Sequence, residues 1–437
     1  MSKERVRNLM YSGITALKAG ELGSARNYLE RALYSARDHD LCADLWFYMS
    51  EAESDEAKKR NALEEALAYR TTHARARRSL AILNGTLKID EIVDANKIAP
   101  PSANDRETHA DRFVCSSCGG RMSFSPDGQT LVCDFCATKD AGENDGEKTQ
   151  EQDFFSAMAT LRGHSKPVAK KIFHCEGCGA EFLLEADDIS ETCAYCASPH
   201  VINHGKTRDL LDPDAIIPHT FDQRRATQFL VEWVLENNFT PHGKVLPPRG
   251  LYIPVWTFDV GGAISYSGEH QAEEQQQDGF GFKTKRVYVT ERGDITIFVD
   301  DLIVPAAKKY ERFLHSVIEN YDLAKTKPYK PRYLSNWSAE TYEIELSKAA
   351  LEARSRAYKS EKKKLKRNLY NLRNIHSSSA NMAITSYKLL LLPVWITSYP
   401  YGDDDYLVLI NGQNGAVTGE LPETLQPKKK GWLKSIF

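Results

Sequence analysis

Eight of the nine cysteines fall into four Cys-x-x-Cys pairs, and the pairs form two sets with identical spacing. In each set, fourteen residues separate the two pairs. Two cysteines with two residues between them can turn both sulfur atoms toward one ion at about 2.3 Å, and two such pairs complete a tetrahedron of donors. The first set consists of Cys115, Cys118, Cys133 and Cys136, and the second of Cys175, Cys178, Cys193 and Cys196.

A tetrahedron of cysteine sulfur atoms is typical of a structural Zn²⁺ site. Four thiolates fill the coordination shell, whereas a catalytic zinc keeps one position open for water. The spacing therefore predicts two structural zinc ions per chain, with an iron–sulfur or redox role as the alternative. The ninth cysteine, Cys42, lies in a helical pattern and is expected to be a buried apolar side chain.

Each cysteine set is expected to sit in a small β zinc ribbon that folds as its own unit. The predicted ribbons span residues 112–138 and 173–204. Gly119 and Gly179 follow the second cysteine of the first pair, where a tight turn often requires a positive φ. The second ribbon carries six acidic residues and no Lys or Arg between Phe173 and His200, so it should repel phosphates and favour protein partners.

The first 93 residues predict a helical domain with an internal repeat. Apolar periodicity favours helices over 4–19, 22–37, 41–52, 55–69 and 73–84. The segment Leu29-Glu-Arg-Ala-Leu33 recurs 34 positions later as Leu63-Glu-Glu-Ala-Leu67. This is the period of tetratricopeptide helix pairs, and the region resembles that repeat. An ordinary helical hairpin domain is the alternative.

The remaining chain is divided by composition. A linker over 94–111 precedes the first ribbon, and an acidic linker with a short helix over 139–172 separates the ribbons. A mixed α+β domain with an antiparallel sheet is expected over 212–423, followed by a basic tail over 424–437. The overall fold class is therefore α+β and multidomain.

Within the domain over 212–423, strands are predicted at 251–258, 286–290, 295–299, 389–398 and 406–410, with a hairpin turn at Asn411-Gly412. Helices are predicted over 226–236 and from a capping Ser338 to about residue 371. The motif Ile253-Pro-Val-Trp256 returns as Leu392-Pro-Val-Trp395, which suggests a duplicated β unit around a helical insertion. The two tryptophans are expected to be core residues.

Two basic segments could contact an anionic surface. From Arg354 to Arg373 there are nine Lys and Arg against one Glu, and the helix Lys362 to Arg367 is the densest part. The tail contains Lys428, Lys429, Lys430 and Trp432, a composition that suits a membrane interface. The alternatives are a solvated helix face and a contact between the basic helix and the acidic second ribbon. Nucleic acid is a less favoured partner because the net charge is −3.

The N-terminus begins directly with an amphipathic helix pattern, and the longest apolar run has eight residues, where about 18 are needed to span a membrane. We therefore expect a cytoplasmic protein whose basic segments would allow peripheral association at the inner membrane face. The sequence has no Gly-x-x-x-x-Gly-Lys-Ser/Thr phosphate loop, no Gly-x-Ser-x-Gly elbow and no His-Glu-x-x-His helix. We expect no enzymatic activity, and Asp300-Asp301 is expected to face water.

The first cysteine set, with Cys115-Ser-Ser-Cys118-Gly-Gly120 and Cys133-Asp-Phe-Cys136, resembles a TFIIB-type zinc ribbon. Residues 112–423 resemble bacterial proteins that contain such ribbons, through Leu251-Tyr-Ile-Pro-Val-Trp-Thr-Phe-Asp259 and Leu409-Ile-Asn-Gly-Gln-Asn-Gly415 among other stretches. Members of this family are often described as similar to primosomal helicases, and some belong to membrane-stress assemblies. This chain departs from a helicase because it lacks the phosphate loop.

These observations favour a zinc-binding scaffold that mediates protein–protein interactions through the helical domain and the ribbons. The alternative is a regulatory protein that binds nucleic acid through its ribbons and its basic helix.

Overall fold

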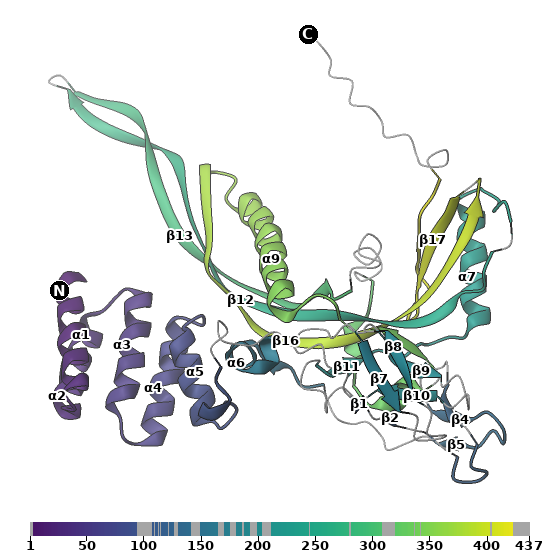
Figure 1. Ribbon diagram of the computed structural model, residues 1–437. Coiled ribbons are helices and arrows are strands. Elements are labelled where there is room, and N and C mark those ends of the chain that lie inside the picture. Colours follow the sequence, from purple (N-terminus) through teal and green to yellow (C-terminus); the bar gives the residue numbers. More distant parts are fainter. Residues whose placement is uncertain are drawn as a thin grey trace.

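The computed structural model has an α+β architecture, in which an N-terminal row of helices adjoins a large mixed sheet (Figure 1). It describes residues 3–93, 107–108, 110–111, 113, 115–120, 122–125, 130–140, 149–164, 170–174, 181–185, 188–192, 199–202, 211–243, 245–278, 281–307, 320–335, 337–340, 342–402 and 404–422.

The N-terminal helices are close to their predicted positions. They are α1 (Lys3–Lys18), α2 (Leu22–Ser35), α3 (His39–Ala52), α4 (Glu56–Tyr69) and α5 (Ala74–Leu83). Both ends of α4 lie 34 positions after the corresponding ends of α2, so the repeat in the sequence is also a repeat in the structure. Cys42 is buried between these helices, as predicted.

Small residues allow the first helix pair to pack closely. A Cβ atom at Gly13 would lie 2.8 Å from Cγ of Leu29, and Ala25 and Ala32 are fully buried on the facing helix. In the second pair Phe47 occupies the position of Gly13, and it packs into a core cluster with Leu63 that extends to α5. The helix row is therefore held by apolar contacts within and between pairs.

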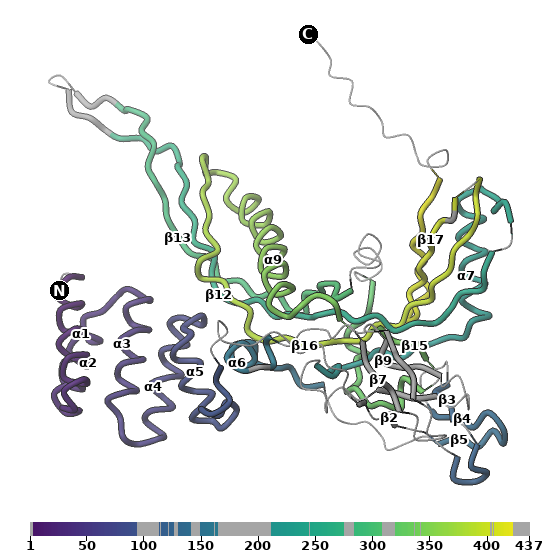
Figure 2. The backbone as a smooth tube through the Cα atoms, in the orientation of Figure 1, coloured from purple at the N-terminus to yellow at the C-terminus, as the bar shows by residue number. Residues whose placement is uncertain are grey.

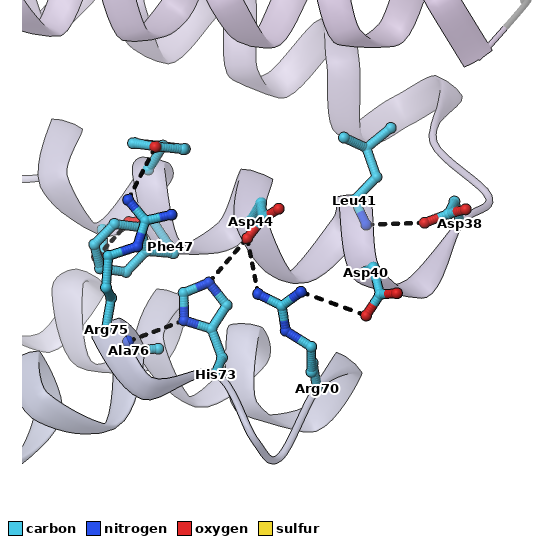
Figure 3. A network of polar contacts seen from close by, with 11 residues as sticks. Asp38, Asp40, Leu41, Asp44, Phe47, Arg70, His73, Arg75 and Ala76 are labelled. Carbon is cyan, nitrogen blue, oxygen red and sulfur yellow. Dashed lines mark hydrogen bonds and ion pairs between the residues drawn. The ribbon is translucent and has the colours of Figure 1, made fainter. Parts of the chain in front are cut away.

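Polar contacts join α3 to the end of the row (Figure 3). His73 is the N-cap of α5: its Nδ1 accepts the Ala76 N–H at 3.0 Å, and its Nε2 lies 3.1 Å from Asp44 on α3. Arg70 also binds Asp44, at 2.9 Å. Because Nδ1 accepts a hydrogen bond, Nε2 carries the proton in the neutral ring and donates it to the carboxylate.

The sheet is built around two long antiparallel strands, β12 (Arg249–Asp278) and β16 (Arg373–Tyr401). Each forms a hairpin with the strand after it, β13 (Gly281–Pro305) or β17 (Asp404–Asn411), and β18 (Val417–Gly419) continues beyond β17. The separate strands predicted at 286–290 and 295–299 are one continuous strand, β13. Short strands complete the edges: β11 (Ala215–Ile216) and β14 (Lys327–Pro328) on one side, and β15 (Ser338–Glu340) and β9 (Asp188–Thr192) on the other.

The predicted antiparallel sheet is therefore only partly correct. The two hairpins are antiparallel, but β11 runs parallel to β16 and β15 runs parallel to β12. Each short strand leads through a helix to the central strand that is not its neighbour, so it runs antiparallel to the strand that follows it and parallel to the strand beside it. The helices are α7 (Gln223–Glu236) after β11 and α9 (Leu346–Asn368) after β15.

An approximate two-fold axis relates two halves of this sheet. The first half runs β11–α7–β12–β13 and the second runs β15–α9–β16–β17. Ile253 of β12 lies directly opposite Leu392 of β16, its counterpart in the repeated motif. Matching hydrogen bonds occur away from the axis: Thr220 N–H donates to Gly412 O, and Glu343 N–H donates to Ala306 O. The duplicated β unit suggested by the sequence thus corresponds to a duplicated β-α-β-β unit.

The proline of the repeated motif lies where each central strand changes its outer neighbour. β12 pairs with β15 up to Tyr252 and with β13 from Val255, so Pro254 falls in between. Pro393 lies at the same point of β16, between its pairing with β11 and with β17. A proline has no N–H to donate to a ladder, and this position requires none. Trp256 and Trp395 are both buried, which confirms that they are core residues.

The predicted start of the long basic helix is wrong. Ser338 belongs to strand β15, and α9 begins at Leu346 after Glu345, whose side chain makes no capping bond. The signal at Ser338 was misleading because the residues that follow it first pair with β12 and only then turn into the helix. The exposed basic residues near the end of α9 are Lys363, Lys364, Lys366 and Arg367.

The two predicted linkers contain short elements. Residues 107–108 form β1 (Glu107–Thr108) and residues 110–111 form β2 (Ala110–Asp111), which pair with β7 (Lys170–His174) and β10 (Pro199–Ile202). In the second linker, β6 (Gln152–Asp153) pairs with β16, and α6 (Phe154–Ala159) gives the expected short helix. Figure 2 shows α6 lying between the N-terminal helices and the sheet. Among the described residues, no helix is long and apolar enough to cross a membrane.

Candidate metal centre

The first cysteine set forms a compact group of four sulfur atoms. Each Sγ lies within 4.8 Å of the others, and the Sγ–Sγ distance is 3.5 Å both for Cys115 with Cys136 and for Cys118 with Cys133. Cys115 and Cys133 are buried, whereas Cys118 and Cys136 are exposed. The group could hold one metal ion, as the spacing of the four cysteines predicts.

The two Cys-x-x-Cys turns have the same backbone structure. In the first turn, Gly119 N–H donates to the Cys115 carbonyl and Cys115 N–H donates to Gly120 O. In the second turn, Ala137 N–H donates to the Cys133 carbonyl and Cys133 N–H donates to Thr138 O. Gly119 has φ 70° and Ala137 has φ 57°, so both turns end in the left-handed region. The positive φ expected at Gly119 is confirmed, and Ala137 adopts the same conformation without glycine.

Hydrogen bonds around the sulfur atoms stabilise thiolates. The hydroxyl of Thr138 lies 3.0 Å from the Cys136 sulfur, and together with its backbone N–H it lowers the pKa of Cys136 to about 6. The backbone N–H groups of Ser117 and Cys118 lower the pKa of Cys115. Thr138 was not identified from the sequence. It lies two residues after Cys136, however, and the backbone amide at that position often contacts the sulfur of a ligating cysteine.

Of the four cysteines, Cys118 is the most difficult to deprotonate. The Gly120 amide lowers the pKa of Cys118, but the sulfur atoms of Cys136 and Cys133 outweigh it and raise that pKa to about 12. Several negative sulfur atoms this close together repel one another, so a cation is required to hold all four as thiolates. The donor set therefore fits a metal ion better than four free thiols.

The module that carries these cysteines is attached to the large sheet. Its strands are β3 (Met122–Phe124), β4 (Leu131–Cys133) and β5 (Lys139–Asp140), which form a small antiparallel sheet. Ser335 binds both ends of β3: its hydroxyl donates to Met122 O at 2.6 Å, and its carbonyl accepts the Phe124 N–H. Trp337 Nε1 donates to Phe124 O at 3.0 Å.

The apolar side of the module belongs to a shared core. Met122, Phe124 and Leu131 are buried in one cluster with Tyr252, near the start of β12, and with Tyr333. Cys115 and Cys133 are members of the same cluster. The module is therefore not separate from the large domain in the structure, because its few residues bury their apolar face against that domain.

The second cysteine set lies outside the described residues, as does the basic tail with Lys428, Lys429, Lys430 and Trp432. The backbone on either side of each pair is described. Cys175 and Cys178 fall between β7 and β8 (Glu181–Glu185), and Cys193 and Cys196 fall between β9 and β10. Both of these strand pairs are antiparallel.

A second acidic group brings Glu151, Asp259 and Asp300 within 4.8 Å of one another. Asp259 is buried, and its carboxylate accepts the Asp301 N–H at 2.9 Å and a hydrogen bond from Ser386. Lys388 binds both Glu151 and Asp301. Hydrogen bonds to Asp259 and the ion pair between Lys388 and Glu151 therefore already engage two of these three carboxylates.

The chain is 26% identical over 332 residues to "Uncharacterized protein YdjG" of Bacillus subtilis (strain 168), and the match spans 74% of this chain and 93% of that protein. No family model matches the sequence, and no solved structure matches it.

Proposed function

We propose that the chain is a zinc-stabilised scaffold that binds a protein partner, and that it is not an enzyme. In this proposal Cys115, Cys118, Cys133 and Cys136 hold a structural Zn²⁺, and the second cysteine set holds another. Support for zinc comes from the all-sulfur donor set and its closed geometry, since four thiolates leave no position for a substrate. The ion would fix the module against the core that it shares with β12.

The observation that carries the scaffold proposal is an exposed aromatic face on the first helix pair. In the second pair Leu45 and Ala62 are buried against the preceding helices. The residues 34 positions earlier are Tyr11 and Tyr28, which are 59% and 37% exposed. The helix face that is buried in the second pair is therefore exposed to solvent in the first pair.

In tetratricopeptide-like arrays, each helix pair buries such a face against its neighbour, and terminal faces are capped by polar residues or by another element. Tyrosine is enriched at protein interfaces because its ring is apolar while its hydroxyl can remain solvated. We therefore place the partner on α1 and α2, with Tyr11 and Tyr28 as its main contacts.

Affinity capture with the full-length protein tests this proposal. Tyr11→Ser combined with Tyr28→Ser should remove the specific partner recovered from a native lysate. Tyr370→Ser is the matched control, because Tyr370 is 87% exposed on a different part of the molecule. Recovery that is unchanged in the double variant would refute the proposed surface.

The alternative is a nucleic-acid-binding regulator, supported by the exposed cations at the end of α9. Nuclease treatment of the same lysate separates the two proposals: complete loss of partners would favour nucleic acid. Attachment to an anionic membrane through the helix Lys362 to Arg367 and residues 428–437 is a further proposal, which vesicle flotation can test. Binding should require anionic lipid and fall as the salt concentration rises.

A further inference from the structure

The strand β13 presents a long free edge. It pairs along one side with β12 from Pro305 to Gly281, and no other strand of the described residues pairs with its second side. At its base Arg356 Nη1 donates to Ile303 O, so that end is already covered. Figure 1 shows the β12–β13 hairpin projecting beyond α9 as a two-stranded arm. An isolated two-stranded ribbon is marginally stable, and an unpaired edge is a template for another strand.

The sequence of this edge is complementary to itself. If a second copy of β13 runs antiparallel with the two copies of Gly293 facing each other, Arg292 lies opposite Asp294 and Arg286 lies opposite Asp300. In the same register Tyr288 faces Phe298, and Thr290 faces Thr296. All of these side chains are exposed, Tyr288 by 57% and Phe298 by 67%.

The opposite face of the strand agrees with this register. Val287 would face Val299, and Val289 would face Ile297. In the free chain Ile297 and Val299 already pack in the core cluster beneath α9, so the two valines of the second copy would extend an existing apolar layer.

Neighbouring registers are unfavourable. A shift that centres the axis on Arg292 or on Asp294 brings two identical charges together at the axis and breaks the other charge pairs. Like charges directly opposite each other destabilise a strand pair, whereas opposite charges and aromatic pairs stabilise it. Each favourable pair also occurs twice, because the contact has two-fold symmetry.

The polar face of the strand is open. Asp294, Thr296 and Phe298 line a cleft of ≈ 810 Å³ that separates them from the helix loops around Asp40 and Tyr69.

From the free edge and its self-complementary sequence, we propose that two copies of this chain associate through β13, giving one sheet that continues across both copies and in which Arg292 of each copy pairs with Asp294 of the other. The occupant of the edge is a second copy of this chain.

Sedimentation velocity of the full-length protein over a range of concentrations tests the proposal. The native chain should dimerise. Arg292→Asp and Asp294→Arg should each weaken the dimer by about tenfold or more, because each places two like-charged contacts across the axis. Arg31→Asp is the matched control, since it makes the same charge change on an exposed position of α2.

The decisive experiment mixes the two charge variants. A copy with Asp at 292 and a copy with Arg at 294 are again complementary, so an equimolar mixture should recover the dimer that neither variant forms alone. A native chain that stays monomeric at every concentration would overturn the proposal. So would a dimer that is insensitive to both variants, or a mixture that fails to associate.

Disulfide cross-linking tests the register. Tyr288→Cys in one copy and Phe298→Cys in the other place the two Cβ atoms about 5 Å apart. Two copies of Tyr288→Cys alone would be separated by ten residues of strand, about 33 Å. Cross-linked dimer should form in the mixture and not in either variant alone, with the native chain as the background control. Cross-linking of a single variant would contradict the register.

Discussion

Ile253 and Leu392 face each other across the central strand pair, and they occupy the same position of a repeated four-residue motif. This pairing places the two-fold axis of the sheet at the repeat itself. Pro254 and Pro393, one residue further along, then fall at equivalent changeovers of neighbouring strands. The metal module packs near this axis, because its core cluster includes Tyr252 and Leu391.

The first prediction concerns helix packing. Gly13→Ala should destabilise the protein by about 1 to 3 kcal/mol, because its Cβ would lie 2.8 Å from Leu29 Cγ in a packed core. Gly23→Ala is the control: it lies in α2 with no atom within 4 Å of the new Cβ, so it should be neutral or stabilise by up to about 1 kcal/mol. Chemical denaturation of both variants checks this, and equal effects would contradict the packing.

The backbone of the cysteine turns gives a second prediction. Gly119→Ala should cost about 1 kcal/mol of stability, because φ is 70° there and no atom obstructs the Cβ. Ala137→Gly should stabilise by about 0.5 kcal/mol, since φ is 57° and the side chain is exposed. Thermal unfolding of the metal-bound protein measures both, and changes of the same sign would refute the matching turns.

A third prediction concerns pH. The hydrogen bond from His73 lowers the pKa of Asp44 below its usual 3.8, and Arg70 lowers it further. The ionised form is therefore favoured by folding, and its contribution is present above pH 3.8 and is lost as the pH falls through the lower folded value. Asp44→Asn should destabilise the helical region at neutral pH by about 1 kcal/mol, because the group is partly solvated.

The pH profile supplies the control for that variant. The stability difference between Asp44→Asn and the native chain should shrink as the pH falls below 3.8. A difference that grows under acid conditions would mean that the carboxylate does not stabilise the fold. Helical circular dichroism during urea titration provides the measurement.

Local patterns were sufficient to predict several elements. Apolar periodicity predicted α1 to α5, and the cysteine spacing predicted the group of four sulfur atoms. Both depend on residues close together in the sequence. The attachment of the module through Ser335 and Trp337 could not be predicted, because it joins segments more than 200 positions apart and has no motif of its own.

The length of the central strands was also missed. Gly262 lies in β12 with φ 120°, and a Cβ there would lie 2.0 Å from Asn381 O, so glycine permits a close approach within a continuous strand. In the sequence, Gly261-Gly262 looks like a strand end. At Ser338 a helix was predicted where the structure has a strand: the expected capping residue lies in β15.

The metal content of the protein purified without added metal tests the proposed zinc sites. The native protein should contain close to two zinc ions per chain. The Cys133→Ser, Cys136→Ser variant should contain close to one, with stability lowered by about 3 kcal/mol or more because Cys133 also lies in the shared core. A folded native protein with no bound metal, or a variant that retains both ions, would contradict the proposed zinc sites.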